Sequence, residues 1–151
     1  MSRIFEFALN KEGQPQFSEA KLPEYQTLQS AGADFFCAED VVIPSSLKHI
    51  LRRKLIEITP TMIHTGIKAN MEPDEGLFLF NRSSNPKKKG MILSNGVGVV
   101  DADYYGNESN DGEIMFPFYN FHPWDVKIKA GEAIGQGVFL KYLRPENAKV
   151  K

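Results

Sequence analysis

GMILSNGVGVVDADYYG, residues 90–106, is the stretch around which the rest of the chain is predicted to be organised. Apolar residues flank Asn95-Gly96, a dipeptide whose easy access to positive φ makes it a strong signal for a tight β-hairpin. The following residues, 97–100, include β-branched side chains that suit a packed pleated surface, so they predict a strand that ends at Asp101. The stretch therefore predicts two short strands joined by a turn, with a carboxylate at the end of the second strand.

Short strands separated by turns are predicted along most of the chain. Nine prolines and twelve glycines divide the 151 residues into short segments. Only residues 45–53 have helical spacing, and they are predicted as a single helical turn or a polar loop. The other predicted strands are residues 3–9, 33–38, 41–44, 54–59, 62–68, 76–81, 113–119, 124–129 and 133–142. About ten short strands with little helix predict an all-β fold, a jelly-roll-like β-barrel that leaves few strand edges open.

Charge and composition exclude several classes of protein. The 18 basic and 19 acidic residues are mixed along the chain and give a net charge of −1, which argues against a nucleic-acid polymer as partner. No run approaches the roughly 20 apolar residues of a membrane helix, and the single cysteine, Cys37, cannot form an intramolecular disulfide. We predict a cytoplasmic protein without a membrane partner, with a bacterial cell or a phage-infected host cell as candidate settings.

Three groups of polar residues could form a site for a phosphorylated substrate. The guanidinium of Arg82 and the hydroxyls of Ser83 and Ser84 are suitable donors for phosphate oxygens, although a solvated turn is the alternative. Asp101 could orient and deprotonate an attacking water, whereas a turn-forming role suits Asp103 better. Tyr104 is a further candidate, but a tyrosine at a strand end more often packs on the core.

Four motifs in order resemble the first four of the five motifs of the homotrimeric dUTPases, the deoxyuridine 5'-triphosphate nucleotidohydrolases. They are SAGAD at residues 30–34, RSS at 82–84, the segment 95–106, and GEAIGQ at 131–136, and the resemblance spans residues 21–140. It implies one dUTPase-like domain over residues 1–151 that hydrolyses dUTP to dUMP and pyrophosphate. It also implies a homotrimer whose active sites are shared between subunits.

The resemblance also implies a role for each site residue. Asp101 would activate the water that attacks the α-phosphorus, and Tyr104 would lie against the deoxyribose and exclude a ribose 2′-hydroxyl. Backbone groups near the turn would read uracil, and the phosphate-binding groups would come from the neighbouring subunit. The uracil-reading residues would be Asn95, Val99 and Val100, and the phosphate-binding residues Ser83, Ser84 and Gln136, with Arg82 and Asp34 organising the site. Mg²⁺ would be held through triphosphate oxygens and water and not by a protein carboxylate cage.

Several features leave alternatives open. Asn85-Pro86 stands where family members often have a small apolar pair, and the Lys87-Lys88-Lys89 run is predicted to be a solvated face. The glycine-rich fifth motif of the family is expected to be absent or truncated after residue 145, which predicts binding of deoxyuridine nucleotides with slow turnover. The alternatives to a dUTPase are a dCTP deaminase-like enzyme of the same fold, against which Asp-Ala-Asp-Tyr at 101–104 argues, and a regulatory nucleotide-binding protein with little catalysis, as some phage-encoded relatives are.

Overall fold

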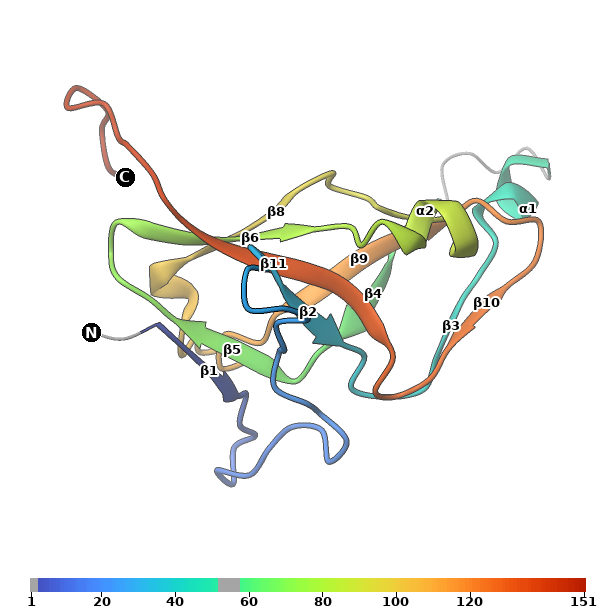
Figure 1. Ribbon diagram of the computed structural model, residues 1–151, viewed down its shortest axis with the longest axis horizontal. Coiled ribbons are helices and arrows are strands. Elements are labelled where there is room, and N and C mark those ends of the chain that lie inside the picture. The colour runs from blue at the N-terminus through green and yellow to red at the C-terminus, as the bar shows by residue number, and fades with distance from the viewer. Residues whose placement is uncertain (1–2, 52–57) are drawn as a thin grey trace.

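The computed structural model describes residues 3–51 and 58–151 (Figure 1). Within these residues the regular secondary structure is mostly β. The strands are β1 (Ile4–Phe7), β2 (Ala33–Phe36), β3 (Val41–Ile43), β4 (Thr61–His64), β5 (Ile67–Asn70), β6 (Glu75–Phe80), β7 (Met91–Leu93), β8 (Gly98–Asp101), β9 (Met115–Asn120), β10 (Val126–Ile128) and β11 (Ala133–Lys141). Two short α-helices, α1 (Ser46–Leu51) and α2 (Ser84–Lys89), and a 3₁₀ turn at Ala102–Tyr104 complete the elements.

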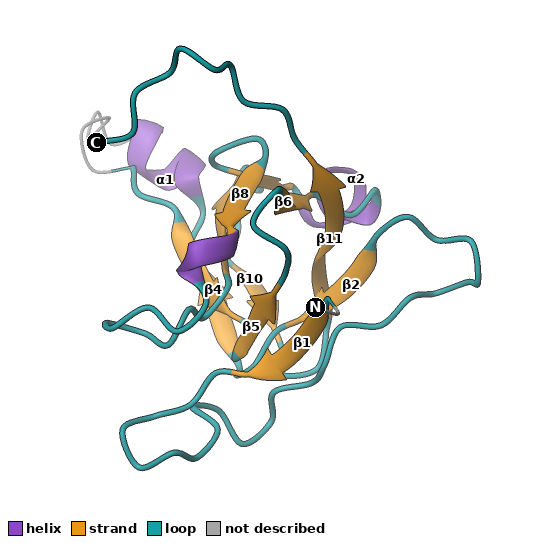
Figure 2. Ribbon diagram, turned by 90° about the vertical axis from the view of Figure 1, so that its left-hand side faces the viewer, coloured by secondary structure: helices purple, strands orange, loops and turns teal. Residues whose placement is uncertain are grey.

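The strands pair into four antiparallel sheets. The largest has the order β2-β11-β6-β8, a second has the order β4-β9-β7, and two strand pairs, β1-β5 and β10-β3, complete the set. In Figure 2 the strands surround one shared interior. The predicted all-β, jelly-roll-like barrel with little helix is therefore confirmed.

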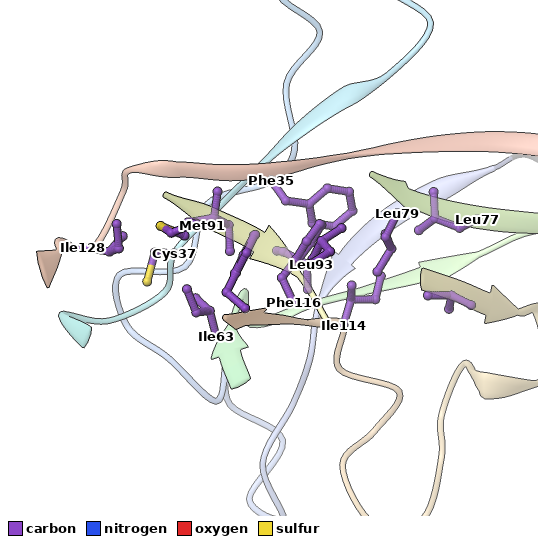
Figure 3. Close-up of a cluster of buried hydrophobic side chains, with 14 of the residues drawn as sticks. Phe35, Cys37, Ile63, Leu77, Leu79, Met91, Leu93, Ile114, Phe116 and Ile128 are labelled. Carbon is purple, nitrogen blue, oxygen red and sulfur yellow. The ribbon is translucent and has the colours of Figure 1, made fainter. Parts of the chain in front are cut away.

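The interior is filled by side chains that alternate along each strand. In β9 the alternate residues Phe116 and Phe118 are fully buried, because successive side chains of a strand point to opposite faces. The ring of Phe116 lies 5.5 Å from that of Phe35 in β2, and Figure 3 shows both rings among the leucines of β6 and β7. Gly135 in β11 faces the Phe116 ring, and a Cβ atom there would lie 2.1 Å from this ring. The close approach of β11 to the aromatic core therefore requires a residue without a side chain.

The turn at Asn95-Gly96 is present, but the predicted hairpin around it is wrong. Gly96 has φ 69° and its N–H donates to the carbonyl of Leu93 at 3.1 Å, so the chain reverses here. The two arms do not pair with each other, because β7 pairs with β9 and β8 pairs with β6. Turn residues set only the reversal. Burial of Leu93 in one sheet and Val100 in another sets the pairing.

Two further segments differ from expectation, and a third prediction lies largely outside the described residues. Residues 62–68 form two strands, β4 and β5, since Gly66 has φ 68° and the Thr65 hydroxyl donates to the Ile114 carbonyl at the corner between them. Helix α2 begins at Ser84, the last residue of the RSS motif. Pro86 lies in its first turn, where the missing N–H costs no helical hydrogen bond. The helical turn predicted within residues 45–53 is present as α1. Of the strand predicted at 54–59 only residues 58 and 59 are described, neither of them in a strand.

No helix in the part of the chain that the structure describes is long and apolar enough to cross a membrane.

Candidate active site

Asp101 is the last residue of β8 and points away from the core. Opposite it in β6 is Gly76, and the strand alternates so that Gly98 and Val100 face inward while Val99 and Asp101 are exposed. The chain then enters the 3₁₀ turn, and the Asp101 side chain makes no cap hydrogen bond to that turn. The turn-forming alternative for this carboxylate is therefore not what the structure shows.

A pocket of about 240 Å³ lies beside Asp101. It brings together five residues that the sequence suggested for catalysis and for base and sugar recognition, namely Asn95, Val99, Val100, Asp101 and Tyr104. Its other walls come from β4, β6, β8 and β9 and from the residues leading into β9, namely Met62, Leu79, Gly98, Glu113, Ile114, Met115 and Pro117. Val99 and Asp101 also line a second hollow of about 480 Å³ that contains Asp103 and Arg144. The carboxylate thus lies where the two depressions meet.

Only one of the two adjacent tyrosines belongs to this pocket. Tyr104 lines it, with the aromatic ring packed against the core. The Tyr105 hydroxyl instead donates to the Glu6 carboxylate, and this bond, together with burial, raises the pKa of Tyr105 to about 12. Lys68 Nζ lies 4.8 Å from the centre of the Tyr105 ring. Tyr105 therefore has a structural role away from the pocket.

A second polar cluster forms where three of the motifs meet. Arg82 Nε lies 3.2 Å from Asp34 Oδ1, and Gln136 Nε2 donates to the Asn81 carbonyl at 3.2 Å. Gln136 is also the direct cross-strand partner of Asp34. A Cβ atom on Gly32 would lie 2.6 Å from Gln136 Oε1, so the glycine of SAGAD leaves room for this side chain. The structure therefore places Asp34, Arg82 and Gln136 together.

Asp34 forms an ion pair with Arg82. It is 6% exposed, and its second oxygen, Oδ2, has no hydrogen-bond partner among the described residues. The Arg82 side chain is about one third exposed and reaches solvent beyond this contact. Ser83 is exposed and Ser84 half-buried at the start of α2. The exposed donors of Arg82 and Ser83 are available to an anion from outside the chain.

The two clusters lie at opposite ends of β6. Gly76 pairs with Asp101, whereas Phe80 pairs with Gln136. These two β6 residues are four positions apart, which spans about 13 Å of extended chain, and Arg82 lies beyond Phe80. The predicted water-activating carboxylate and the predicted phosphate donors of one chain are therefore not brought together.

Two polar residues next to the pocket were not anticipated from the sequence. Asn110 and Glu113 both contact the Tyr104 hydroxyl. The turn-rich segment NESND at residues 107–111 predicts a loop, but nothing in it indicates which side chain reaches back to Tyr104. Asn85 was also missed as an anchor: it is fully buried and donates from Nδ2 to the Ile134 carbonyl, which fixes the chain after RSS.

The remaining candidates do not form a second centre. The described residues contain no group of three or more His, Cys, Asp or Glu side chains arranged to hold a metal. Cys37 is fully buried in the core, and burial raises the pKa of its thiol. In the lysine run, Lys87 and Lys88 are exposed as predicted, whereas Lys89 pairs with Glu132 at 3.1 Å.

Comparison with known proteins identifies the family. A family model described as dUTPase matches residues 18–151. The deoxyuridine 5'-triphosphate nucleotidohydrolase of Lactococcus lactis is 41% identical over 123 residues, which cover 81% of this chain and 73% of the relative. The crystal structure of the Streptococcus mutans dUTPase is 34% identical, with a TM-score of 0.75 over 95% of this chain and 98% of that one. A dUTPase of Staphylococcus bacteriophage 80alpha, 20% identical with a TM-score of 0.72, shares the fold. The chain therefore belongs to the dUTPase family.

Proposed function

We propose that this dUTPase-family enzyme hydrolyses dUTP to dUMP and pyrophosphate, with Asp101 activating the attacking water. The observation that carries the proposal is the state of the Asp101 carboxylate. It is exposed at the end of a rigid strand beside the pocket, and no donor among the described residues occupies it. A carboxylate that is fixed in place yet free of internal partners is available to accept a proton from water.

The reaction is a displacement at the α-phosphorus. As the water oxygen forms its bond to this phosphorus, Asp101 accepts a proton from the water, and the bond from the α-phosphorus to the oxygen bridging to the β-phosphate breaks. Pyrophosphate leaves with the bridging oxygen. Little covalent chemistry is required of the protein, so its contribution is orientation of the water and stabilisation of charge on the phosphates.

Uracil would be read by the backbone of β8 and the Asn95 turn. β8 is the last strand of its sheet and pairs only with β6 among the described residues. Alternate residues of such an edge strand direct their N–H and C=O groups outward, where a base can accept and donate hydrogen bonds. Backbone groups placed to match uracil reject cytosine, whose donor and acceptor are reversed at position 4, and close approach leaves no space for the 5-methyl group of thymine.

Tyr104 would select the sugar. Its ring lies in the same pocket as Val99 and Asp101, so a nucleotide whose base contacts β8 would place its sugar against this ring. A deoxyribose face can pack closely on an aromatic ring, whereas a ribose 2′-hydroxyl would need space and a hydrogen-bonding partner there.

Phosphate binding would be completed by a second copy of the chain in a homotrimer. The separation of about 13 Å along β6 keeps Arg82, Ser83, Ser84 and Gln136 of one chain away from its own Asp101. A neighbouring subunit could supply these donors to the pocket beside Asp101. Sites shared between subunits would explain why one chain carries the two halves of a site at opposite ends of β6.

Mg²⁺ fits this site only as a companion of the substrate. Among the described residues no cage of carboxylates exists, and Asp101 offers one exposed carboxylate. The ion would be held through phosphate oxygens and water, where it neutralises charge on the triphosphate. Asp101 could contact one of the ion's waters while its main role remains toward the attacking water.

Product analysis tests the proposal directly. The protein is incubated with Mg²⁺ and either dUTP or dCTP, and dUMP, pyrophosphate and ammonia are measured separately. Equimolar dUMP and pyrophosphate from dUTP, without ammonia from dCTP, is the expected result. Release of ammonia from dCTP would indicate a deaminase, and tight dUTP binding without products would indicate a regulatory protein. Either of these outcomes would overturn the proposal.

A further inference from the structure

We propose that Asn110 is a positioning residue for Tyr104 and thereby contributes to discrimination between deoxyribose and ribose nucleotides. The inference rests on the proposed role of Tyr104 at the sugar. It assigns a function to the loop of residues 105–112, whose sequence gives no sign of one.

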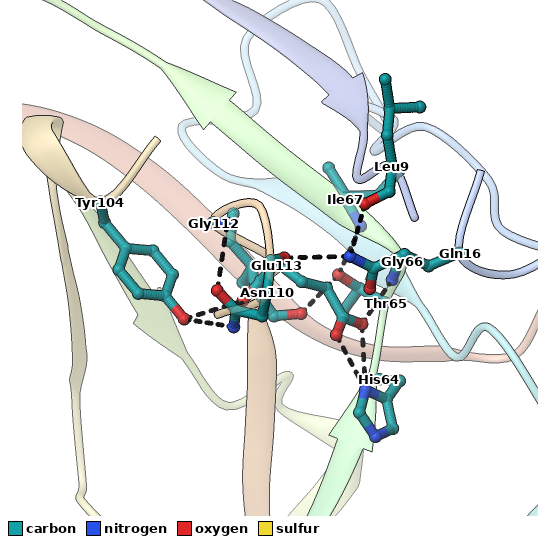
Figure 4. A network of polar contacts seen from close by, with 11 residues as sticks. Leu9, Gln16, His64, Thr65, Gly66, Ile67, Tyr104, Asn110, Gly112 and Glu113 are labelled. Carbon is teal, nitrogen blue, oxygen red and sulfur yellow. Dashed lines mark hydrogen bonds and ion pairs between the residues drawn. The ribbon is translucent and has the colours of Figure 1, made fainter. Parts of the chain in front are cut away.

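The Tyr104 hydroxyl is held at two points (Figure 4). It accepts a hydrogen bond from Asn110 Nδ2 at 2.7 Å and donates to the Glu113 carbonyl at 3.3 Å. Asn110 Nδ2 also lies 3.4 Å from the same carbonyl. The hydroxyl is at the far end of the ring from Cβ, so bonds there restrict the swing of the whole ring about χ1.

Asn110 is itself fixed by the loop that carries it. Its Oδ1 accepts from the Gly112 N–H at 3.1 Å, and its carbonyl accepts from Gln16 Nε2 at 3.0 Å. The amide orientation follows from this pattern, because Oδ1 is used by a donor and Nδ2 must then face the tyrosine oxygen. Asn110 therefore presents a donor to Tyr104 from a determined position.

Glu113 anchors the other partner of the hydroxyl. Its carboxylate is almost fully buried and accepts from the Gly66 N–H at 3.0 Å and from His64 Nδ1 at 2.9 Å. These bonds attach the residue to the corner between β4 and β5, as Figure 4 shows. The carbonyl that accepts from Tyr104 is thus held by the barrel.

The loop itself has little freedom to shift. Gly112 has φ 81°, and a Cβ there would lie 2.5 Å from the Tyr104 carbonyl oxygen, so the loop is in direct contact with the backbone of the tyrosine. Asp111, at φ 58°, accepts from the Leu9 N–H and from Lys68 Nζ, both at 2.7 Å. Contacts to the barrel on both sides hold Asn110 next to the pocket.

This arrangement gives the tyrosine ring a fixed position against the sugar. A ring held only by packing could tilt and make space for a 2′-hydroxyl. Swinging the Tyr104 ring away about χ1 requires breaking the bonds to Asn110 and Glu113, which adds a cost to binding of a ribonucleotide but none to binding of a deoxyribonucleotide. Discrimination is expressed as the ratio of kcat/KM for dUTP to kcat/KM for UTP.

The test is a double-mutant cycle on this ratio with Asn110→Ala, Tyr104→Phe and the double variant. Asn110→Ala is expected to lower the ratio by roughly three- to tenfold, the range that corresponds to the net contribution of one neutral hydrogen bond. Tyr104→Phe should lower it by a similar factor, and Asn110→Ala should add nothing in the Tyr104→Phe background. Equal, independent effects of Asn110→Ala in both backgrounds would overturn the inference.

Asn107→Ala is the matched control. Asn107 lies in the same loop and its side chain accepts from Ser109, without contact to the Tyr104 hydroxyl. The Asn107→Ala variant should leave the ratio of kcat/KM for dUTP to kcat/KM for UTP unchanged. A fall in this ratio equal to that in Asn110→Ala would show a general effect of loop damage and overturn the inference. If Asn110→Ala does not fold, Tyr104→Phe probes the same two bonds, and an unchanged ratio in that variant overturns the inference.

Tyr104→Ala separates this inference from the proposed function. An unchanged ratio in Tyr104→Ala would remove the sugar-selecting role of the ring and with it the basis of the inference. A lowered ratio in Tyr104→Ala with an unchanged ratio in Asn110→Ala would retain the role of the ring and overturn only the role of Asn110.

Discussion

Arg82 Nε lies 3.2 Å from Asp34 Oδ1, so the guanidinium that follows β6 is held by a carboxylate of β2. Two motifs that are far apart in the sequence thereby form one unit. The exposed remainder of the Arg82 side chain is left in a defined orientation for an anion.

Asp34→Asn tests this unit. Loss of the charge should leave Arg82 less well oriented, and kcat/KM for dUTP should fall roughly tenfold, as expected for loss of a charge-assisted hydrogen bond. Asp74→Asn is the matched control, since Asp74 pairs with Lys141 at the surface and takes no part in the pair of Asp34 with Arg82. Equal activity of Asp34→Asn and the wild-type chain would show that Arg82 is oriented by other contacts.

Asp101→Asn should abolish hydrolysis while binding of a non-hydrolysable dUTP analogue is retained. The amide keeps the shape of the side chain but cannot accept the proton of the attacking water. Turnover is measured by pyrophosphate release and affinity by calorimetry. Asp103→Asn, an exposed carboxylate in the same turn, serves as control and should remain active. Retained activity of Asp101→Asn would assign the proton acceptor to another group.

Mixing two inactive variants tests whether sites are shared between subunits. Asp101→Asn chains retain the phosphate donors, and Arg82→Ala chains retain the carboxylate. If each site combines residues of two subunits, unfolding and refolding the two variants together should restore dUTP hydrolysis in the sites that receive an intact half from each chain. A mixture with only the average activity of the separate variants would place each site within one chain.

Gly135→Ala should destabilise the fold by about 1–3 kcal/mol, because the new methyl group would overlap the fully buried ring of Phe116. Gly76→Ala in β6 is a suitable comparison, since its Cβ would lie 3.0 Å from the edge of the Phe78 ring, which is only half-buried and can move. Urea unfolding of the two variants gives the difference. Similar losses of unfolding free energy in Gly135→Ala and Gly76→Ala would show that β11 can shift away from the aromatic core.

Asp111→Asn should remove a pH-dependent contribution to stability. Burial alone would raise the pKa of Asp111, but hydrogen bonds from Lys68 and from the Leu9 N–H outweigh it and hold the pKa below its usual value. The contribution is therefore fully present above the usual pKa, about 3.9, and is lost as pH falls through the lower pKa of the folded protein. Asparagine tolerates the positive φ of this position. The free energy of unfolding of the wild-type chain should exceed that of the variant at pH 7, and the difference should shrink below about pH 4. A difference that is constant across this range would contradict the assignment.

Local signals in the sequence predict local features of this structure well. The reversal at Asn95-Gly96 and the position of Asp101 at the end of a strand both follow from a few neighbouring residues. Residues 62–68 were predicted as one strand and form two, because a glycine within a strand pattern is compatible with a bulge as well as a corner. Partner choice could not be predicted either, since pairing of β8 with β6 depends on burial of side chains far away in the sequence.

The same limit applies to the site. Arg82, Asp34 and Gln136 were suggested by separate motifs, and the structure brings them together. Asn110 was not suggested, because its contact to Tyr104 arises from the path of a loop closed by Gly112 and Asp111. Three-dimensional closure of a loop is decided by contacts to Leu9, Lys68 and the barrel, none of which is adjacent in the sequence.

The open outer edge of β8 has a consequence for how specificity can be studied. Main-chain N–H and C=O groups are the atoms proposed to read the base, and every residue type except proline carries both of them. Alanine scanning of residues 98–101 leaves these atoms in place and therefore cannot detect their contribution to base selection. Backbone chemistry, such as replacement of an amide by an ester, is the approach that can remove one recognition atom at a time.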